Sequence, residues 1–206
     1  MSDGEMSDGE MSLNPAIVVL GPGGLDLAHR IAGVAPGAQI HGLARRITAA
    51  DVRFDDTGKH LRELFAAGTP VIGICAAGIL IRLLADALTD KTTEPPVIAV
   101  AEDGSAVVPL LGGHHGANDM AARIGRMLGV AAAVTTAGDV RFGVALDNPP
   151  AGWTLANPDN VKSFAGDLLA GVTVRLDGSV PPFIADAGIE RDLGGVLRIT
   201  ATPYAE

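Results

Sequence analysis

Short apolar runs alternate with segments of mixed polarity along most of the chain. The runs, whose length and aliphatic content predict buried strands, are residues 16–20, 38–43, 70–75, 96–101, 105–111 and 131–136. Helices are predicted between them at 25–32, 57–65, 76–88 and 118–128. Short strands that alternate with helices favour an α/β fold. Its sheet is mainly parallel, with helices on both faces in a Rossmann-like three-layer arrangement.

Turn and capping residues mark the ends of several of these elements. Asp103-Gly104 separates the fourth and fifth apolar runs, which is a signal for a β-hairpin. Thr57 is placed to cap one helix, and Asn118 is placed to cap the helix that ends at Gly129. The boundaries of these elements are therefore predicted by side-chain chemistry as well as by the apolar pattern.

The regular alternation of apolar runs and helices ends after residue 143. Asn148, Pro149 and Pro150 resemble a linker, and they precede a predicted helix at 158–169 and two predicted strands at 172–176 and 196–200. We therefore predict a disordered tail at 1–12, an N-terminal α/β domain at 13–143 and a small α+β appendage at 144–206.

Charge and cysteine content narrow the class of protein. The net charge of −9 argues against a nucleic-acid partner, which would need a basic face. Arg82 interrupts the longest apolar stretch, 71–89, so a strand and a helix explain it better than a membrane span. The single cysteine, Cys75, allows no disulfide within the chain, which fits a reducing cytoplasm.

The strongest candidate site is the loop that joins the fifth apolar run to the helix at 118–128. It consists of two glycines, His114, His115 and Gly116. Glycine loops that open onto a helix N-terminus bind anions, and imidazoles there are suited to proton transfer near neutral pH. Asp119 suits the positive end of the helix dipole. The other histidines, His29, His41 and His60, are scattered and are expected to be structural or exposed.

Other polar residues follow predicted strands. Arg82, one turn after Gly78, has two interpretations: a surface charge in a salt bridge, or a clamp for an anionic substrate. Thr135, Thr136 and Asp139 could line the same crevice or could form a turn with side-chain caps.

The first strand is followed by Gly21, Gly23 and Gly24, an arrangement found in nucleotide-binding folds. The third glycine of the usual pattern is missing, so a tight strand-to-helix turn is the preferred interpretation. A nucleotide site at this turn is the alternative.

Several of these motifs occur together in one known family. In this order, Gly78-Ile79 with Arg82, Asp90-Lys91, the hairpin ending in Pro109-Leu110-Leu111, the Gly-His loop and Thr135-Thr136 resemble the CbiG family of cobalt-precorrin-5A hydrolases. The resemblance covers residues 17–177, and residues 161–176 look like the family's middle domain. Since the sequence stops at Glu206, the family's C-terminal domain is expected to be absent.

This resemblance implies hydrolytic opening of a lactone on a cobalt-containing tetrapyrrole, with loss of acetaldehyde. His114, His115 and Asp119 are then the candidate catalytic residues, with a histidine activating water or protonating the leaving alkoxide. The candidate residues for substrate binding are Gly78, Arg82, Lys91, Gly113, Gly116, Asn118, Thr135, Thr136 and Asp139.

No cofactor and no protein-bound metal are expected, because cobalt would arrive inside the substrate. The alternative function is a non-catalytic tetrapyrrole-binding module that assists the precorrin-3B C17-methyltransferase of the same pathway. No membrane partner is expected. A homodimer is compatible with the sequence, which leaves the oligomeric state open.

Overall fold

The computed structural model describes residues 14–90, 93–147, 149–150 and 152–202. The predicted tail at 1–12 and Lys91 lie outside these residues. The described chain folds into two compact units that meet in sequence between Val134 and Thr135. The sequence placed this boundary after residue 143. The division falls earlier because helix α5 (Ala137–Phe142) contributes Phe142 to the hydrophobic core of the C-terminal unit.

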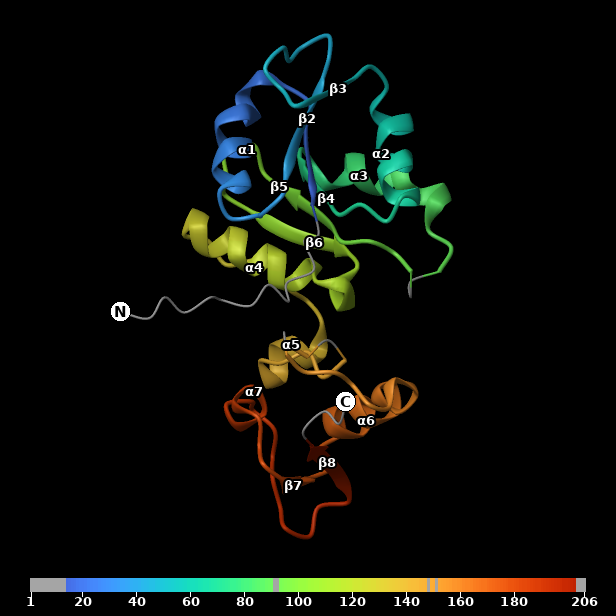
Figure 1. The fold of residues 1–206 in the computed structure, drawn as a ribbon, viewed down its shortest axis with the longest axis vertical. Helices are drawn as coiled ribbons and strands as arrows, with labels where there is room; N and C mark the ends of the chain where they lie inside the picture. Colours follow the sequence, from blue (N-terminus) through green and yellow to red (C-terminus); the bar gives the residue numbers. More distant parts are fainter. Residues whose placement is uncertain (1–13, 91–92, 148, 151, 203–206) are drawn as a thin grey trace, which may run out of the picture. The chain divides into compact units, whose positions relative to one another are not determined.

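A six-stranded sheet forms the centre of the N-terminal unit (Figure 1). Its strands are β1 (Ala16–Val19), β2 (Gln39–Leu43), β3 (Val52–Phe54), β4 (Val71–Ile74), β5 (Val97–Val100) and β6 (Val107–Leu111), in the order β3-β2-β1-β4-β5-β6. All neighbours are parallel except β5 and β6, which form an antiparallel hairpin. The mainly parallel sheet and the hairpin at Asp103-Gly104 are both confirmed.

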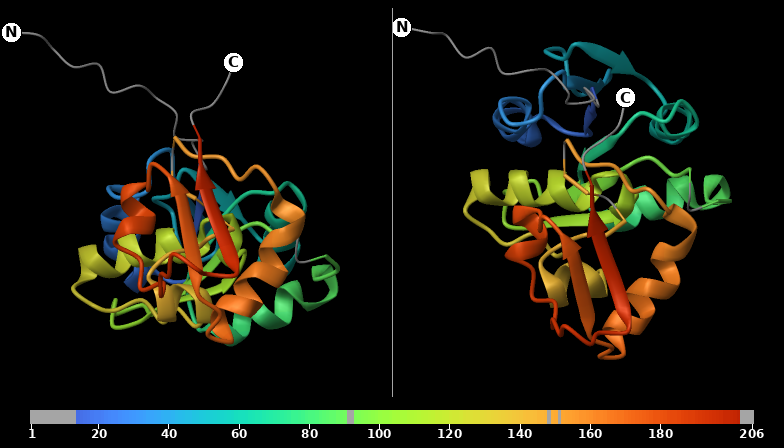
Figure 2. Two further views of the ribbon diagram at one scale, coloured as in Figure 1. Left: turned by 90° about the horizontal axis from the view of Figure 1, so that it is seen from below. Right: turned by 60° about the horizontal axis from the view of Figure 1, so that its bottom comes forward.

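Alternate residues of each buried strand face different layers of helices. In β1, Ile17 and Val19 pack with α1 (Leu25–Ala32) and α4 (Ala117–Leu128). Ala16 and Val18 pack on the other side with α2 (Thr57–Ala66) and α3 (Ala77–Leu84). Strands buried on both faces are expected to be continuously apolar, which explains the runs seen in the sequence. The arrangement has three layers, as predicted (Figures 1 and 2).

Two predicted helix caps are wrong. The side chain of Asp56, not Thr57, accepts the hydrogen bond from the backbone N–H of Lys59 at 2.9 Å and so caps α2. Asn118 lies inside the first turn of α4, whose N-cap is Gly116. Gly116 has φ of 95°, a left-handed conformation that favours glycine, so the chain enters the helix earlier than predicted.

The predicted strand at 131–136 is also wrong. Within it only Ala132 forms a β-bridge, to Val107, and its residues alternate between exposed and half-buried. Thr136 is the N-cap of α5, a helix that the apolar pattern did not predict. A third difference is that the predicted helix at 76–88 stops at Leu84 and continues as the 3₁₀-helix η2 (Ala85–Ala87).

The C-terminal unit is a small α+β structure. Its two strands, β7 (Val174–Gly178) and β8 (Leu197–Ala201), are parallel, with Val174 opposite Leu197. The other elements are α5, the 3₁₀-helix η4 (Pro158–Asn160), α6 (Val161–Leu169) and α7 (Pro182–Ala185). Phe142, Leu168, Val174 and Ile189 form its buried core.

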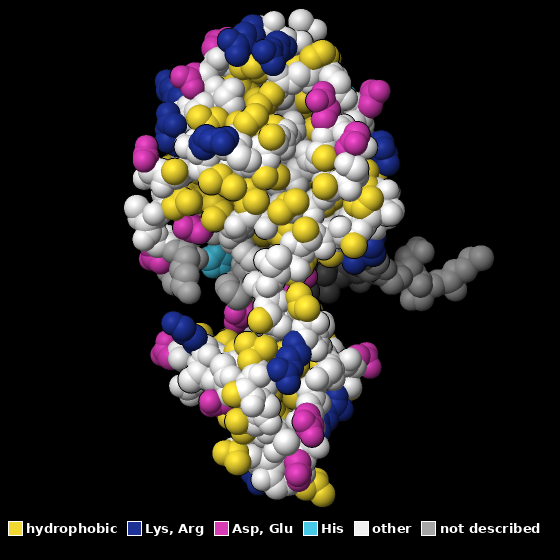
Figure 3. All heavy atoms as spheres, turned by 180° about the vertical axis from the view of Figure 1, so that it is seen from behind, with side chains coloured by type: hydrophobic (Ala, Val, Ile, Leu, Met, Phe, Trp, Pro, Cys, Tyr) yellow, Lys and Arg dark blue, Asp and Glu magenta, His cyan; other side chains and the backbone are white. Residues whose placement is uncertain are grey.

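Two further observations concern the helices and the surface of the described residues. In the part of the chain that the structure describes, no helix has the length and apolar character needed to span a membrane. On the face drawn in Figure 3, Lys and Arg side chains are interspersed with Asp and Glu, so no continuous basic patch forms there.

Candidate functional site

The antiparallel direction of β6 determines where the glycine–histidine loop lies. Leu111, at the end of β6, pairs with Val97 at the start of β5, whereas Val107 pairs with Val100. The loop after Leu111 is therefore at the edge where the parallel strands begin. The usual ligand-binding edge of such sheets is the one where the parallel strands end, so the loop lies at the opposite edge.

Two glycines give this loop its shape. Gly112 has φ of 68° and Gly116 has φ of 95°, and they enclose the 3₁₀-helix η3 (Gly113–His115). A Cβ on Gly112 would lie only 2.7 Å from the backbone nitrogen of Pro96. The backbone N–H groups of His115 and Ala117 both donate to the Gly112 carbonyl, at 2.9 and 3.1 Å. The loop is therefore a tight turn held against the segment that precedes β5.

His115 is oriented by the same segment. Its Nδ1 lies 2.7 Å from the backbone carbonyl oxygen of Glu94. A carbonyl oxygen can only accept, so Nδ1 carries the proton and donates it. In the neutral imidazole the lone pair is then on Nε2. Since His115 is exposed, this nitrogen is suited to accept a proton from a water molecule.

Asn118 and Asp119 lie beside the loop in the first turn of α4. The amide of Asn118 lies 3.4 Å from the position that a Cβ on Gly113 would occupy, so the two residues are neighbours. Asp119 is exposed near the positive end of the helix dipole. The structure thus brings Gly113, His115 and these two residues together, with Gly116 between them. The side chain of His114 lies outside the described atoms.

Gly78 and Arg82 lie together but at the opposite edge of the sheet. Arg82 Nη1 donates to the Gly78 carbonyl at 3.0 Å within α3, which begins directly after β4 ends. On β5, Val97 lies at the edge that holds the loop and Val100 lies at the opposite edge. These two residues are three positions apart, so the edges are separated by about 10 Å. The sequence allows two interpretations of Arg82, as a partner in a surface salt bridge or as an anion clamp. Among the residues that the structure describes, Arg82 forms no salt bridge.

Three further predicted residues belong to the other unit of the chain. Thr135, Thr136 and Asp139 belong to the C-terminal unit, where Thr136 and Asp139 form the start of α5. They follow an extended segment and not a strand. Over the residues that the structure describes, no group of three or more histidine, cysteine or acidic side chains is arranged to hold a metal ion.

The glycine turn after β1 has the character of a structural turn. A Cβ on Gly24 would lie 2.9 Å from Ile74 and 3.0 Å from Val19, so this glycine allows close packing of helix on strand. The carboxylate of Glu102 lies directly against Gly23. A negative charge at this position disfavours a nucleotide phosphate, so both observations support the preferred interpretation.

A pair of histidines on the α2 side of the sheet was not predicted from the sequence. Nδ1 of His41 on β2 lies 2.8 Å from Nε2 of His60 on α2, and the His60 ring stacks on Phe54 at 4.4 Å. Burial, together with the neighbouring His60, lowers the pKa of His41 to about 4. Burial also lowers the pKa of His60. Their separation in sequence gave no signal, because only the β2–α2 packing brings them together.

The fold and this loop define a class: a doubly wound α/β protein with a glycine–histidine loop between an antiparallel edge strand and a helix. Residues 59–139 match the family model described as "Cobalamin synthesis G N-terminal". That segment contains the loop, so this part of the chain is similar to the N-terminal part of the CbiG family.

Two curated relatives and one solved structure are similar to the chain. It is 37% identical to a cobalt-precorrin-5A hydrolase of Salmonella typhimurium over 136 residues, which are 64% of this chain and 38% of the relative. It is 32% identical to the hydrolase of the same name from Priestia megaterium over 112 residues, which are 53% of this chain and 30% of the relative. A crystal structure of a cobalamin biosynthesis protein G homolog from Sulfolobus solfataricus has 17% identity and a TM-score of 0.44. That likeness covers 83% of this chain and 52% of the other.

Proposed function

We propose that this chain hydrolyses the lactone of cobalt-precorrin-5A, with loss of acetaldehyde, in the biosynthesis of cobalamin. The observation that carries the proposal is the position of His115 within the segment shared with the family. Its Nδ1 donates to the Glu94 carbonyl and its Nε2 faces away from that bond, in a segment that matches the family model. Both curated relatives are named as hydrolases. The chain spans well under half of these relatives, so their complete activity is part of the proposal.

The loop supplies the groups that opening a lactone requires. His115 Nε2 takes a proton from water while the water oxygen forms a bond to the lactone carbonyl carbon. The negative charge that develops on the carbonyl oxygen faces the N-terminal end of α4 beside Gly116, where the helix dipole is positive. When the ring C–O bond breaks, the imidazolium returns its proton to the leaving alkoxide. Lactone opening gives a carboxylate, after loss of its proton to solvent, and a hydroxyl. Acetaldehyde leaves when this hydroxyl loses its proton and becomes a carbonyl, as the carbon–carbon bond that joins it to the tetrapyrrole breaks; the tetrapyrrole keeps the electron pair of that bond and takes up a proton.

The other candidate residues take supporting roles in the proposal. Asn118 and Gly113 border the carbonyl site, and Asp119 and His114 are further catalytic candidates at the same helix end. Gly78 and Arg82, at the other edge, are proposed to contact a different part of the substrate, whose carboxylates suit a guanidinium. Lys91, Thr135, Thr136 and Asp139 are kept as substrate-binding candidates on the resemblance alone.

Cobalt enters this proposal as part of the substrate, and the reaction needs no further cofactor. We expect it to take place in the cytoplasm. A role as a non-catalytic partner of a methyltransferase is not favoured by any observation on the described residues, and the name shared by both relatives supports the hydrolase instead.

The test is acetaldehyde release from the lactone-bearing cobalt-precorrin, measured with the purified chain. We expect release above the spontaneous rate, together with a change in the absorption spectrum of the substrate. A spectral change on binding without release would contradict the hydrolase and favour a binding module. If there is no spectral change and no release, the tetrapyrrole is not the ligand of this chain.

A further inference from the structure

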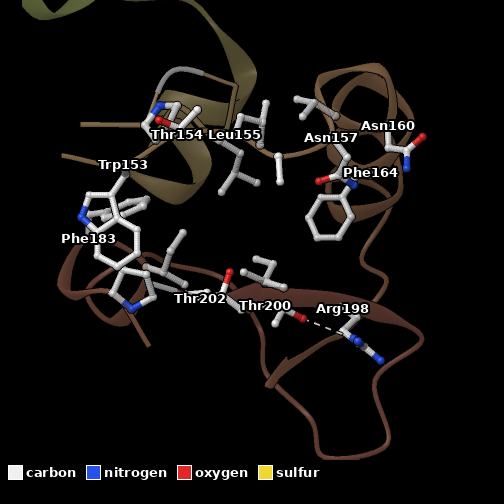
Figure 4. A pocket seen from close by; sticks show the side chains of 18 residues that line it. Trp153, Thr154, Leu155, Asn157, Asn160, Phe164, Phe183, Arg198, Thr200 and Thr202 are labelled. Carbon is white, nitrogen blue, oxygen red and sulfur yellow. Dashed lines mark hydrogen bonds between the residues drawn. The ribbon is translucent and has the colours of Figure 1, made fainter. Parts of the chain in front are cut away.

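The C-terminal unit contains a pocket that the proposed function does not use. Its volume is about 210 Å³, and Figure 4 shows side chains converging on it from three sides. Trp153 and Phe183 form one end, with ring centroids 5.5 Å apart at 65°. Phe164 of α6 lies at the other end, and Thr200 of β8 forms part of the wall between them.

The size and the walls of the pocket suit a flat ring. An apolar cavity of about 150 Å³ is large enough to bind benzene, so this pocket has room for one or two fused rings. Aromatic walls favour edge-to-face or offset contacts with such a ring. Trp153 and Phe183 already meet edge to face, so a further aromatic ring can extend the same packing.

The polar groups of the pocket indicate what the ring should carry. Asn157 and Asn160 place amide groups beside Phe164 (Figure 4). Among the described residues that line the pocket, Arg198 is the only charged one. Arg198 lies at the open edge of the pocket, where its Nε donates to Thr200 Oγ1 at 3.3 Å and its guanidinium is exposed to solvent (Figure 4).

The charge of Arg198 is only partly neutralised by its neighbours. Its Nε lies 3.0 Å from Asp177 Oδ2, and the Nε of Arg175 lies 3.1 Å from the other oxygen of the same carboxylate. One carboxylate thus faces two guanidinium groups, and the three side chains together carry one positive charge. A carboxylate on the ligand would complete this cluster.

We propose that this pocket binds a flat compound of one or two fused rings that carries a carboxylate side chain. The ring lies between Trp153, Phe183 and Phe164, and the carboxylate lies toward Arg198. This binding site is confined to the C-terminal unit, and it does not depend on whether the N-terminal unit is a hydrolase.

The only tryptophan of the chain makes the site directly observable. Trp153 gives a single indole N–H signal in a ¹⁵N-labelled sample of the whole chain, and naphthalene-1-acetate serves as the probe. We expect a saturable shift of this signal, with a dissociation constant about threefold lower for naphthalene-1-acetate than for its neutral amide. Arg198→Gln should make the two affinities equal. Lys162→Gln, which removes the same charge from an exposed position on α6, should leave the preference intact.

Three results would overturn the proposal. One is the absence of a saturable shift for the unaltered chain. Another is equal affinity for the acid and the amide. The third is an equal loss of preference in Arg198→Gln and Lys162→Gln, since the charge would then act through the net charge of the chain and not within the pocket. Arg198 has a side chain 60% exposed, so its substitution should leave the fold intact, which the remaining ¹⁵N signals will check.

Discussion

The imidazole of His115 donates to the backbone carbonyl of Glu94 across a distance of 2.7 Å. This bond joins the glycine–histidine loop to the segment that enters β5, and it fixes which ring nitrogen faces outward. The orientation of a general base by a hydrogen bond to its second nitrogen is a recurrent device in hydrolases. The relationship therefore makes the role of His115 testable apart from that of any other histidine.

We expect His115→Asn to abolish most of the acetaldehyde release while leaving substrate binding largely intact. Asparagine can still donate to Glu94 but cannot take up a proton, so a loss of about a hundredfold or more in turnover should follow. The rate of acetaldehyde release gives the turnover, and the spectral change on binding gives the affinity for the substrate. His29→Asn, at an exposed position on α1, is the matched control and should behave as the unaltered chain does. Unchanged turnover in His115→Asn would remove the general base from the mechanism.

The shape of the loop depends on Gly112, and a second glycine provides the control. Gly112 and Gly129 have φ of 68° and 74°, but a Cβ would meet the Pro96 nitrogen at 2.7 Å in the first case and nothing within 4 Å in the second. In both alanine variants a residue with a Cβ must adopt the left-handed backbone conformation, which lowers the free energy of unfolding by about 1–2 kcal/mol. Gly112→Ala should be destabilised by about 1–3 kcal/mol more, because the backbone of Pro95 and Pro96 must move. Urea unfolding of both variants measures the difference, and equal losses would show that the loop is not held against this segment.

Much of the fold followed from the apolar runs, and the site's position did not. β1, β4 and β5 are buried at every position, so their continuous apolar character identified them. Periodicity carries no information on strand order, so the sequence could not place the loop and Gly78 at opposite edges of the sheet. Only the antiparallel pairing of β6 separates them.

The incorrect and missed elements have local causes. Residues 131–136 resemble a buried strand because Ala and Val are apolar, but beyond the single bridge of Ala132 the segment finds no described strand to pair with. β3 is short and has an exposed arginine, Arg53, at its centre, which hides its strand character. The pairing of His41 with His60 depends on tertiary packing, so no local pattern could predict it.

The histidine pair predicts a loss of stability in mild acid. The pKa of His41 is lowered to about 4 in the folded chain from 6.5, so the unfolded chain binds more protons between these values. The free energy of unfolding should therefore fall as the pH decreases from about 6.5 to 4, by at most about 3 kcal/mol for this group. Asp56 and Asp103 also have lowered pKa values, but their effect is confined to pH values near and below 3.8.

Substitution of His41 tests its share of this decrease, to which the lowered pKa of His60 also contributes. His41→Gln should flatten the decrease between pH 6.5 and 4, measured by urea unfolding at several pH values, whereas the exposed His29→Gln should not. The cost of substitution at neutral pH does not enter the comparison, because only the slope with pH is compared. The same slope in both variants would show that His41 is not the group that titrates.

The turn after β1 provides a last test, because its two glycines have different surroundings. A Cβ on Gly24 would press on Ile74 and Val19 in the buried core, and the cost of overpacking a core is about 1–3 kcal/mol. A Cβ on Gly23 would meet only the carboxylate of Glu102, an exposed and flexible side chain that can move aside. We therefore expect Gly24→Ala to lower the free energy of unfolding clearly and Gly23→Ala to lower it by less than about 1 kcal/mol.

Calorimetric titration with ATP and NAD at millimolar concentration completes this test. A structural turn should bind neither nucleotide, in the unaltered chain or in Gly23→Ala. Binding that Gly23→Ala abolishes would restore the nucleotide site as the function of this turn, because the added methyl group would then block a phosphate and not merely displace Glu102. Destabilisation confined to Gly24→Ala, without nucleotide binding, would show that the turn serves the packing of α1 on the sheet.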